Sequence, residues 1–278
     1  MSIANTEMAA AWDEEAANWI KYEDSYERTG VELWPLFLTG VELNESDRVL
    51  DLGCGTGGGT RSLAELVPQG SVVGIDLSTR MVAHAREVTA RKGVPNIEFV
   101  DGDAQVFPFE PDHFDLAVSC FGSMFFAHPV AAFTNVGRAL RPGGRLALLT
   151  WRPIAENEWL VAFRTALALG RDLPAPPTDA PGPFGLANPD HVRRVLAGAG
   201  FSDIALDPLD VDLDFGADLD SAYDYVVSMG ITRGLTAALD DAGRRRALAS
   251  LRETLESHET PKGVSIGAAA WRVTARRA

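Results

Sequence analysis

Short apolar runs alternate with segments of helical periodicity through the first part of this sequence. The apolar runs are residues 48–52, 71–77, 96–100, 114–120 and 145–151. Such alternation is typical of βαβ units, which assemble a parallel sheet with helices on both faces and right-handed crossovers. No internal repeat of about 20–50 residues, which would indicate a solenoid or a propeller, is visible. The sequence therefore predicts an α/β fold.

Helical signals flank these strands. One or two helices are expected over residues 6–26, and others over 60–67, 79–92 and 130–140. The helix over 79–92 is the clearest, because Ser78 can cap its start and Gly93 can end it. After residue 151 the sequence predicts a helix over 156–169, a proline-rich loop or lid hinge over 172–183, and a second helix over 189–199. A half-exposed edge strand is expected over 201–215. Two amphipathic helices, over 221–239 and 240–257, and a last strand over 264–274 follow.

Three aspartates, Asp210, Asp212 and Asp214, alternate with apolar residues in the expected edge strand. They lack the glycine and the terminal glutamate of a calcium loop. We therefore interpret them as the exposed face of a strand. No metal site is expected.

The first strand leads directly into Gly53-Cys54-Gly55-Thr56-Gly57-Gly58-Gly59. Glycines allow a sharp turn and a close approach of the backbone to a ligand, and the helix that follows offers free N–H groups and a positive dipole end. A nucleotide-like ligand is therefore expected here, at the carboxyl ends of the strands. Gly53, Gly55 and Gly58 also satisfy the dinucleotide pattern, with Asp76 near the place of its ribose-binding acid, so a nicotinamide cofactor remains an alternative.

Acidic residues favour one of the two ligands. Asp51 stands two residues before the first glycine, where a carboxylate is unfavourable beside a pyrophosphate but favourable beside an ammonium or sulfonium cation. Asp103, in the acidic tip 101–104, could accept a hydrogen bond from an adenine amine. Asp51 could also simply cap the turn, and Asp76 could be an ordinary strand-end acid. The set as a whole points to a cationic ligand that carries adenosine.

These motifs resemble, in order and spacing, those of Rossmann-like S-adenosylmethionine-dependent methyltransferases, in particular small-molecule enzymes of the quinone-biosynthesis type. The resemblance is carried by VLDLGCGTGGGT at 49–60, VVGIDLS at 72–78, DGDA at 101–104, FDLAVSCFG at 114–122 and LRPGGRLALLTW at 140–151. It implies a seven-stranded, mostly parallel sheet with an antiparallel last strand, N-terminal helices, and a helical lid inserted before that strand. It also implies in-line transfer of the methyl group of S-adenosylmethionine to an oxygen, nitrogen or carbon atom of a small acceptor, leaving S-adenosylhomocysteine.

On this resemblance the chain divides into three parts. Residues 1–44 are expected to form an N-terminal helical cap, and residues 45–152 the cofactor-binding Rossmann-like core. Residues 153–278 are expected to complete the sheet and to carry an inserted acceptor-side lobe over about 219–258.

The resemblance also implies cofactor contacts. Asp51 would meet the amino group of the methionine part, Asp76 both ribose hydroxyls, and Asp103 the adenine amine. The other implied cofactor contacts are Gly53, Cys54, Gly55, Thr56, Leu77, Met81, Gly102, Ala104, Ser119 and Cys120. Met81 could equally be a core residue, and Cys54 is expected to pack beneath the turn rather than to act as a nucleophile. Glycines 57–59 depart from the family's pattern, so the contacts of this helix start remain open.

Transfer from a sulfonium needs in-line approach and exclusion of water, whereas a general base is optional. Candidate catalytic residues are His128, beside the end of the fourth strand, and Tyr22 on the N-terminal helix; His128 could instead serve only the start of a helix. His191 and His258 are expected on helix surfaces. The acceptor pocket is expected from Trp12, Trp19, Tyr26, Ser123, Met124, Phe125 and Trp151. Such a lining predicts a lipophilic or aromatic acceptor.

Composition bears on the partners and the compartment. The chain carries 25 basic and 39 acidic side chains, a net charge of −14, which disfavours a nucleic-acid partner. Its longest apolar stretch, 116–127, is shorter than the roughly 20 residues of a membrane span, and the N-terminus lacks the features of a signal peptide. Two cysteines cannot form a disulfide framework. We expect a cytoplasmic enzyme without nucleic-acid or membrane partners and leave a homodimer open. A non-catalytic cofactor-binding partner protein is the remaining alternative.

Overall fold

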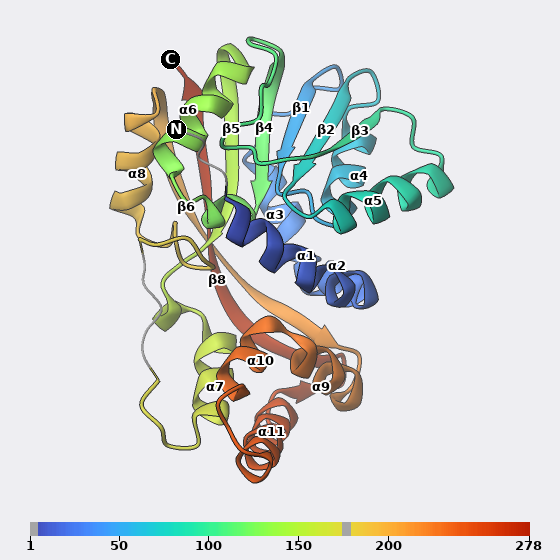
Figure 1. The fold of residues 1–278 in the computed structure, drawn as a ribbon, viewed down its shortest axis with the longest axis vertical. Coiled ribbons are helices and arrows are strands. Elements are labelled where there is room, and N and C mark those ends of the chain that lie inside the picture. Colours follow the sequence, from blue (N-terminus) through green and yellow to red (C-terminus); the bar gives the residue numbers. More distant parts are fainter. Residues whose placement is uncertain (1–4, 174–178) are drawn as a thin grey trace.

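The computed structural model describes residues 5–173 and 179–278. Its centre is one mixed sheet in the order β3-β2-β1-β4-β5-β8-β6 (Figure 1). The parallel strands are β1 (Arg48–Leu52), β2 (Ser71–Asp76), β3 (Ile97–Asp101), β4 (Phe114–Cys120) and β5 (Leu140–Trp151). β8 (Gly263–Arg277) runs antiparallel between β5 and β6 (Phe201–Gly216). The expected Rossmann-like sheet is confirmed, with one addition: a two-residue strand, β7 (Glu259–Thr260), pairs with β8.

Helices cover both faces of the sheet, as the alternation of its strands requires. On β1, Val49 packs with Leu63 in one hydrophobic core, whereas Leu50 packs with Phe133 in the other. Successive side chains of a strand point to opposite faces, so Asp51 lies on the Val49 side. The helices on that side are α3 (Leu33–Thr39), α4 (Gly58–Leu66) and α5 (Thr79–Lys92), and those on the other side are α6 (Pro129–Ala139) and α8 (Pro189–Gly198).

The caps expected for α5 are present. The Ser78 hydroxyl accepts a hydrogen bond from Met81 N at 3.2 Å, and Gly93 ends the helix with φ +68°. The junction between α6 and β5 differs from the prediction. The helix ends at Ala139 and β5 begins at once with Leu140, five residues before the strand predicted over 145–151. Gly143 has φ +72°, which glycine adopts without strain.

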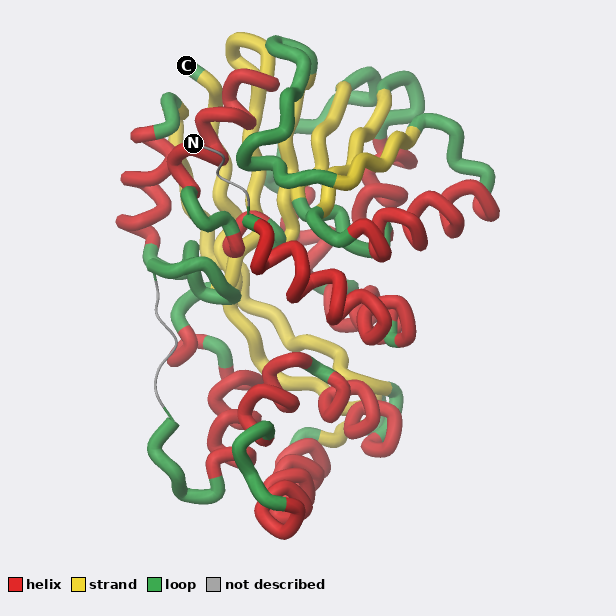
Figure 2. Tube along the Cα trace, in the orientation of Figure 1, coloured by secondary structure: helices red, strands yellow, loops and turns green. Residues whose placement is uncertain are grey.

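A second lobe lies beyond the parallel strands. β6 and β8 are 16 and 15 residues long and extend past the ends of their neighbours (Figures 1 and 2). The helices gathered around this extension are α7 (Glu158–Ala168), α9 (Leu219–Ser228), α10 (Gly230–Thr236) and α11 (Asp241–Glu256). The prediction of a single helix over 221–239 is wrong. Met229 adopts an extended conformation with ψ 141°, which separates α9 from α10.

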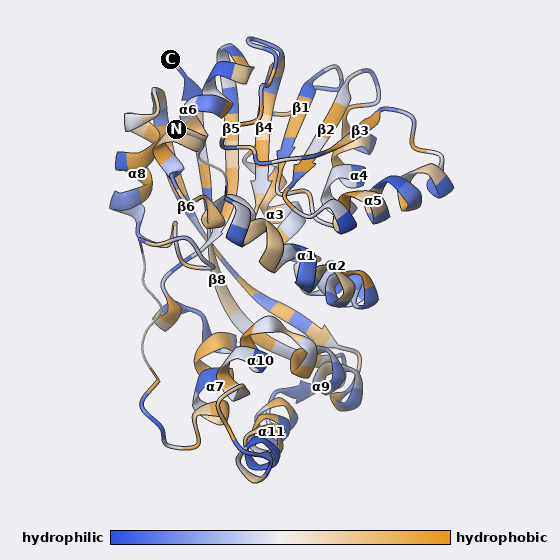
Figure 3. Ribbon diagram, viewed as in Figure 1, coloured by the Kyte–Doolittle hydropathy of each residue, from blue (hydrophilic) through white to orange (hydrophobic). Residues whose placement is uncertain are grey.

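Alternating polar and apolar bands mark the extended part of β6 (Figure 3). Leu213 and Phe215 are buried, and Asp210 forms an ion pair with Arg152 at 2.7 Å. Asp214 lies 3.7 Å from Arg28. Within residues 5–173 and 179–278, no group of three or more His, Cys, Asp or Glu side chains is placed to hold a metal ion.

Three helices precede the sheet. α1 (Thr6–Lys21) and α2 (Glu23–Gly30) lie against the carboxyl ends of the parallel strands, between the sheet and the second lobe (Figure 1). The sequence predicted one or two helices here and missed α3, whose Pro35 lies in the first turn, where proline is tolerated. No helix in the part of the chain that the structure describes is long and apolar enough to cross a membrane.

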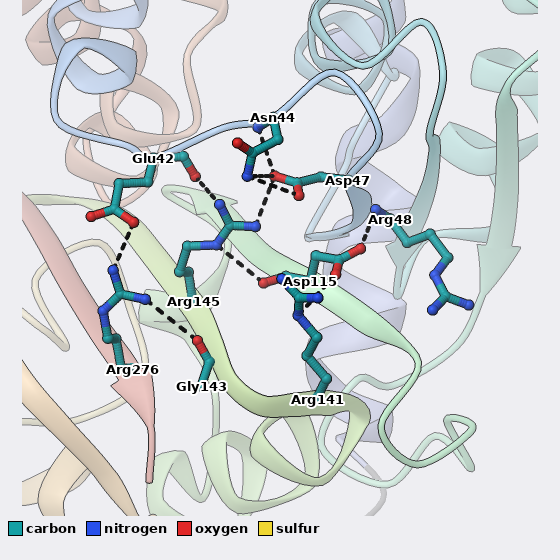
Figure 4. A network of polar contacts seen from close by, with 9 residues as sticks. All are labelled: Glu42, Asn44, Asp47, Arg48, Asp115, Arg141, Gly143, Arg145 and Arg276. Atoms are coloured by element: carbon teal, nitrogen blue, oxygen red, sulfur yellow. Dashed lines mark hydrogen bonds and ion pairs between the residues drawn. The ribbon is translucent and has the colours of Figure 1, made fainter.

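An ionic network ties the amino ends of the strands together, opposite α1 (Figure 4). The Arg145 guanidinium donates to Asp47 Oδ2 at 2.8 Å and to the Glu42 carbonyl at 2.7 Å. The side chains of Arg145 and Asp47 are both buried. Asp115 accepts a hydrogen bond from Arg48 N at 2.7 Å and pairs with Arg141. A buried pair of this kind is costly to break, so this end of the sheet is fixed.

Candidate active site

The glycine turn after β1 is held against two neighbouring strands. Gly53 N and Cys54 N donate to the Ile75 carbonyl of β2 at 2.8 and 3.1 Å. A Cβ on Gly53 would lie 2.8 Å from Gly122 Cα, beyond the end of β4. A Cβ on Gly55, whose φ is +54°, would meet no atom within 4 Å. The turn is thus closed by protein at Gly53 and open at Gly55, as a cradle for a ligand requires.

Asp51 is buried beneath this turn. Its Oδ2 accepts a hydrogen bond from the hydroxyl of Thr60, in the first turn of α4, at 2.6 Å. Burial raises the pKa of Asp51 to about 6, although the Thr60 hydrogen bond opposes the shift, and the nearby negative charge of Asp76 adds to it. A cation beside Asp51 would stabilise its carboxylate.

Asp76 ends β2 with both carboxylate oxygens engaged. Oδ2 accepts a hydrogen bond from Gly55 N at 2.8 Å, and Oδ1 accepts one from Ser78 N at 2.9 Å. Burial raises the pKa of Asp76, while these backbone hydrogen bonds oppose the shift. Asp76 therefore fixes the glycine turn to the start of α5.

Asp103 lies beyond the end of β3, next to the N-terminal segment. Its Oδ1 accepts hydrogen bonds from Gln105 N and Gln105 Nε2 at 3.0 and 3.1 Å. Its Oδ2 accepts one from Asn5 N at 3.1 Å. The backbone before α1 thus occupies the carboxylate that was expected to receive an adenine amine.

The other expected cofactor residues surround these acids. Cys54 packs in a small buried cluster with Val82, Ala85 and Phe99, and burial raises the pKa of its thiol well above the ordinary value. The remaining cofactor candidates divide by exposure: Thr56, Met81, Ala104 and Ser119 are buried, whereas Leu77, Gly102 and Cys120 are partly exposed. None of these placements by itself assigns a contact to a ligand.

Ser119 connects the end of β4 to the turn that follows. Its hydroxyl donates to the Leu52 carbonyl at 2.8 Å and accepts from Ser123 N at 2.9 Å. Ser123 begins the short helix η1 (Ser123–Phe125), and Met124 Sδ lies 3.5 Å from Trp151 N. Three of the expected acceptor-pocket residues, Ser123, Met124 and Trp151, are therefore close together.

The aromatic candidates of α1 and α2 pack against one another and against neighbouring elements. Trp19 and Tyr26 stack with their ring centroids 3.7 Å apart, and Tyr26 packs edge-on against Tyr225 of α9 at 5.1 Å. Trp12 of α1 packs edge-on against Phe125 at 5.0 Å. Burial raises the pKa of Tyr26 to about 12. The aromatic residues of α1 and α2 thus bridge the sheet and the second lobe.

The two candidate catalytic residues differ in position. The Tyr22 hydroxyl lies 3.2 Å from Lys21 Nζ, and its ring centroid is 6.2 Å from that of Tyr225. His128 is exposed at the start of α6, where its backbone N donates to Gln105 Oε1 at 2.9 Å.

An ionic cluster around the buried Arg61 was missed by the sequence reasoning. Arg61 of α4 donates to the Thr56 carbonyl at 3.0 Å and to Glu23 Oε1 at 2.9 Å, and Glu23 Oε2 lies 2.8 Å from His84 Nε2. Arg61 also pairs with Glu27 at 3.4 Å. An arginine inside the apolar pattern of a short helix was the available signal. The cluster holds α2 against α4 and α5 beside the glycine turn.

Comparison with known proteins agrees with this geometry. The family model described as "Methyltransferase domain" matches residues 49–144, the segment with the glycine turn and the acids. The curated protein "Ubiquinone/menaquinone biosynthesis C-methyltransferase UbiE" of Pseudomonas aeruginosa is 38% identical over 130 residues, which are 45% of this chain and 50% of that protein. The chain thus spans about half the length of the curated relatives it matches. Residues 49–144 are thus similar in sequence to a methyltransferase domain, in agreement with the resemblance.

Two solved structures share the fold. YcgJ of Bacillus subtilis aligns with a TM-score of 0.58 at 19% identity, over 88% of this chain and 98% of that chain. The (4+2)-cyclase SpnF aligns with a TM-score of 0.55 at 21% identity, over 88% of this chain and 80% of that chain. At such identities the likeness shows the fold alone. Since one of these neighbours is titled a cyclase, the reaction of this chain has to be argued from its site.

Proposed function

We propose that this protein is an S-adenosylmethionine-dependent methyltransferase that acts on a small, lipophilic or aromatic acceptor. The observation that carries the proposal is the row of acids at one edge of the sheet. Asp51 lies in β1, Asp76 ends β2 and Asp103 follows β3, around a turn that is open at Gly55. The guanidinium beside the turn, that of Arg61, is already engaged by the Thr56 carbonyl and Glu23, so the three carboxylates suit a ligand that carries a positive charge, ribose hydroxyls and an amine.

Each of the three acids fits a different part of the cofactor. Asp51, whose pKa is raised to about 6 by burial, would gain a partner in the amino group of the methionine part. Asp76 would accept hydrogen bonds from both ribose hydroxyls, sharing oxygens that already hold Gly55 N and Ser78 N. Asp103 would receive the adenine amine in place of Asn5 N. When bound, S-adenosylmethionine supplies a methyl group that is activated by the positive charge on sulfur.

The chain's own residues would orient the acceptor and exclude water. α1 lies over the carboxyl ends of the strands, and the Trp19–Tyr26 stack closes the space toward α9. Where the acceptor must lose a proton, Tyr22 is the better placed of the two candidates, because its ring lies among the aromatic residues, 6.2 Å from the ring of Tyr225. His128 is exposed and would act only if the loop before α6 moved.

The acceptor, compartment and assembly are parts of the same proposal. The curated relative named above is titled a C-methyltransferase of ubiquinone and menaquinone biosynthesis, and the aromatic residues of α1 and α2 suit an acceptor of similar lipophilicity. In this proposal residues 45–152 bind the cofactor, and the lobe over about 219–258 supplies the acceptor side. The protein would work in the cytoplasm without a nucleic-acid partner. Light scattering would decide whether it forms a homodimer.

The proposal is tested by incubating the protein with S-adenosylmethionine carrying a carbon-13 methyl group and a panel of phenols, amines and quinols. Mass spectrometry should find the label in one small product, together with an equal amount of S-adenosylhomocysteine. Turnover only on protein or RNA would contradict the acceptor class. Tight binding of S-adenosylhomocysteine without any turnover would favour a non-catalytic partner protein. Preferential binding of NADH would favour an oxidoreductase.

A further inference from the structure

A small cavity of about 20 Å³ lies beside the end of β4, next to the expected acceptor site. Its wall is formed by η1, the start of α6, residues 179–186 and the first turn of α8. The side chains of Met124, Phe126 and Leu186 make part of this wall apolar. A volume of this size accommodates about one water molecule or one hydroxyl group.

Two residues of this wall each carry a buried polar atom that has no hydrogen-bond partner among the described residues. These atoms are Ser123 Oγ and His191 Nε2. Ser123 is only 1% exposed. The expectation that His191 is a surface residue of its helix is therefore wrong for its Nε2, which is shielded from solvent. A buried hydroxyl and a buried imidazole nitrogen without partners are unfavourable unless a ligand or a water supplies them.

The cavity is joined to the proposed methyl-transfer site by short contacts. Ser123 N donates to Ser119 Oγ at 2.9 Å, and Ser119 Oγ donates to the carbonyl of Leu52, the residue before the glycine turn. Phe125, at the other end of η1, packs against Trp12 of α1. η1 thus connects the cofactor cradle, through Ser119, with the wall of the cavity.

The surrounding loop holds this wall in place. Gly182 N donates to the Met124 carbonyl at 3.1 Å. A Cβ on Gly185 would lie 2.5 Å from the same carbonyl oxygen, so only glycine fits where this loop crosses η1. At the start of α8, Asn188 caps the helix through Asp190 N and His191 N. Ser123 and His191 are therefore presented from two separately anchored segments.

We propose that Ser123 and His191 form a subsite that binds a hydroxyl oxygen of the acceptor. A hydroxyl both donates and accepts one hydrogen bond, so it matches a serine hydroxyl, which does both, and an imidazole nitrogen, which does either according to its tautomer. Because the cavity holds no more than one hydroxyl group, only that group enters it, and the apolar remainder of the acceptor extends from its mouth beside the partly exposed Phe126. This inference rests on the proposed function and narrows its acceptor to a hydroxylated lipophile, held by these two residues as positioning groups.

Phenol and toluene provide matched probes, because they have nearly the same shape and differ in the hydroxyl group. Binding of each is measured by saturation-transfer NMR and calorimetry on the full chain, with and without saturating S-adenosylhomocysteine. The wild-type protein should bind phenol at least about fivefold more tightly than toluene, the discrimination expected of one net hydrogen bond or more. Ser123→Ala and His191→Phe should each reduce this preference, and the double variant should abolish it.

Matched controls separate the subsite from general effects. Ser202→Ala and His113→Gln change the same residue types on β6 and before β4, away from the cavity wall, and should leave the preference unchanged. If His191→Phe fails to fold, His191→Gln with Ser123→Ala decides the question. The S-adenosylhomocysteine affinity of the Ser123 and His191 variants should stay within about twofold of wild type.

Equal binding of phenol and toluene to the wild type, or a preference that survives both substitutions, would overturn the subsite. A crystal structure in which one water bridges Ser123 and His191, combined with no phenol binding, would overturn it as well. Failure of the wild type to bind S-adenosylhomocysteine would instead count against the proposed function. The phenol preference is measured without the cofactor too, so the two failures are distinguishable.

Discussion

Asp13 Oδ1 accepts a hydrogen bond from Ser78 Oγ at 2.7 Å, across 65 residues of sequence. The same oxygen accepts from Arg80 N at 3.1 Å, so α1 is attached to the first turn of α5. With the Asn5–Asp103 contact, this places α1 over the proposed adenosine site. These hydrogen bonds lower the pKa of Asp13, so its carboxylate stays ionised at neutral pH.

Release of α1 should therefore limit cofactor exchange. We expect Asp13→Ala to raise both the association and the dissociation rate of S-adenosylhomocysteine severalfold, because one attachment of α1 is lost while the acids beneath it remain. Stopped-flow tryptophan fluorescence measures both rates. Glu14→Ala, at the neighbouring exposed position, is the control. Unchanged rates in Asp13→Ala would mean that α1 does not have to move.

Asp76 should carry much of the affinity for the adenosine part. Asp76→Asn removes the charge that would accept two ribose hydroxyls, and hydrogen bonds to a charged group contribute about 1.5–3 kcal/mol each. We expect the S-adenosylhomocysteine affinity to fall by about 10- to 100-fold in calorimetry. Asp101→Asn changes an exposed acid at the end of β3 and should have little effect. Equal losses in both variants would indicate only a general electrostatic effect.

Cofactor binding should weaken in mild acid because of Asp51. With a pKa of about 6, this carboxyl group is mostly ionised at pH 7 and mostly protonated at pH 5. A cationic amino group binds the ionised form, so the affinity for S-adenosylhomocysteine should fall by about tenfold between these pH values. Asp51→Asn should flatten this dependence. The same profile in wild type and Asp51→Asn would exclude Asp51 as its source.

The stability of the free protein should depend on pH in the opposite direction to its cofactor affinity. Since folding raises the pKa of Asp51, the stabilising contribution of its protonated form is fully present below the ordinary pKa of 3.8 and is lost as the pH rises through about 6. A bound cation would offset that loss. Thermal stabilisation by S-adenosylhomocysteine should therefore be larger at pH 7 than at pH 5.

Arg61 should be important for stability rather than chemistry. Its side chain is 6% exposed and that of its partner Glu23 is 17% exposed. Arg61→Ala would leave Glu23 with only His84, and breaking a buried pair of this kind costs about 3 kcal/mol. Denaturant unfolding measures the loss. Glu27→Gln, at the half-exposed partner, should cost less than about 1 kcal/mol. Equal losses in the two variants would contradict the role of burial.

The parallel half of the fold could be predicted because its signals are local. Strands β1 to β4 are short apolar runs, β5 contains one over 145–151, and Ser78 and Gly93 cap α5 from positions adjacent in sequence. The placement of the three acids that we propose for cofactor binding could also be predicted, since parallel strands bring their carboxyl ends to one edge. Local pattern and chain direction were sufficient for both.

The contacts that close the site depend on distant residues and had no such signal. The Trp19–Tyr26 stack meets Tyr225 about two hundred residues later, and Ser123 meets the same cavity as His191. His191 looks like a helix-surface residue in sequence, whereas its Nε2 is buried beside a cavity that η1 and residues 179–186 also line. The break at Met229 precedes Gly230 and could have been expected from that glycine alone.

A crystal structure of the complex with S-adenosylhomocysteine tests the central claim most directly. We predict both ribose hydroxyls within about 3 Å of the Asp76 carboxylate, the amino group beside Asp51, and the adenine amine at Asp103 in place of Asn5 N. A ligand bound elsewhere, or no binding at millimolar concentration, would contradict the account.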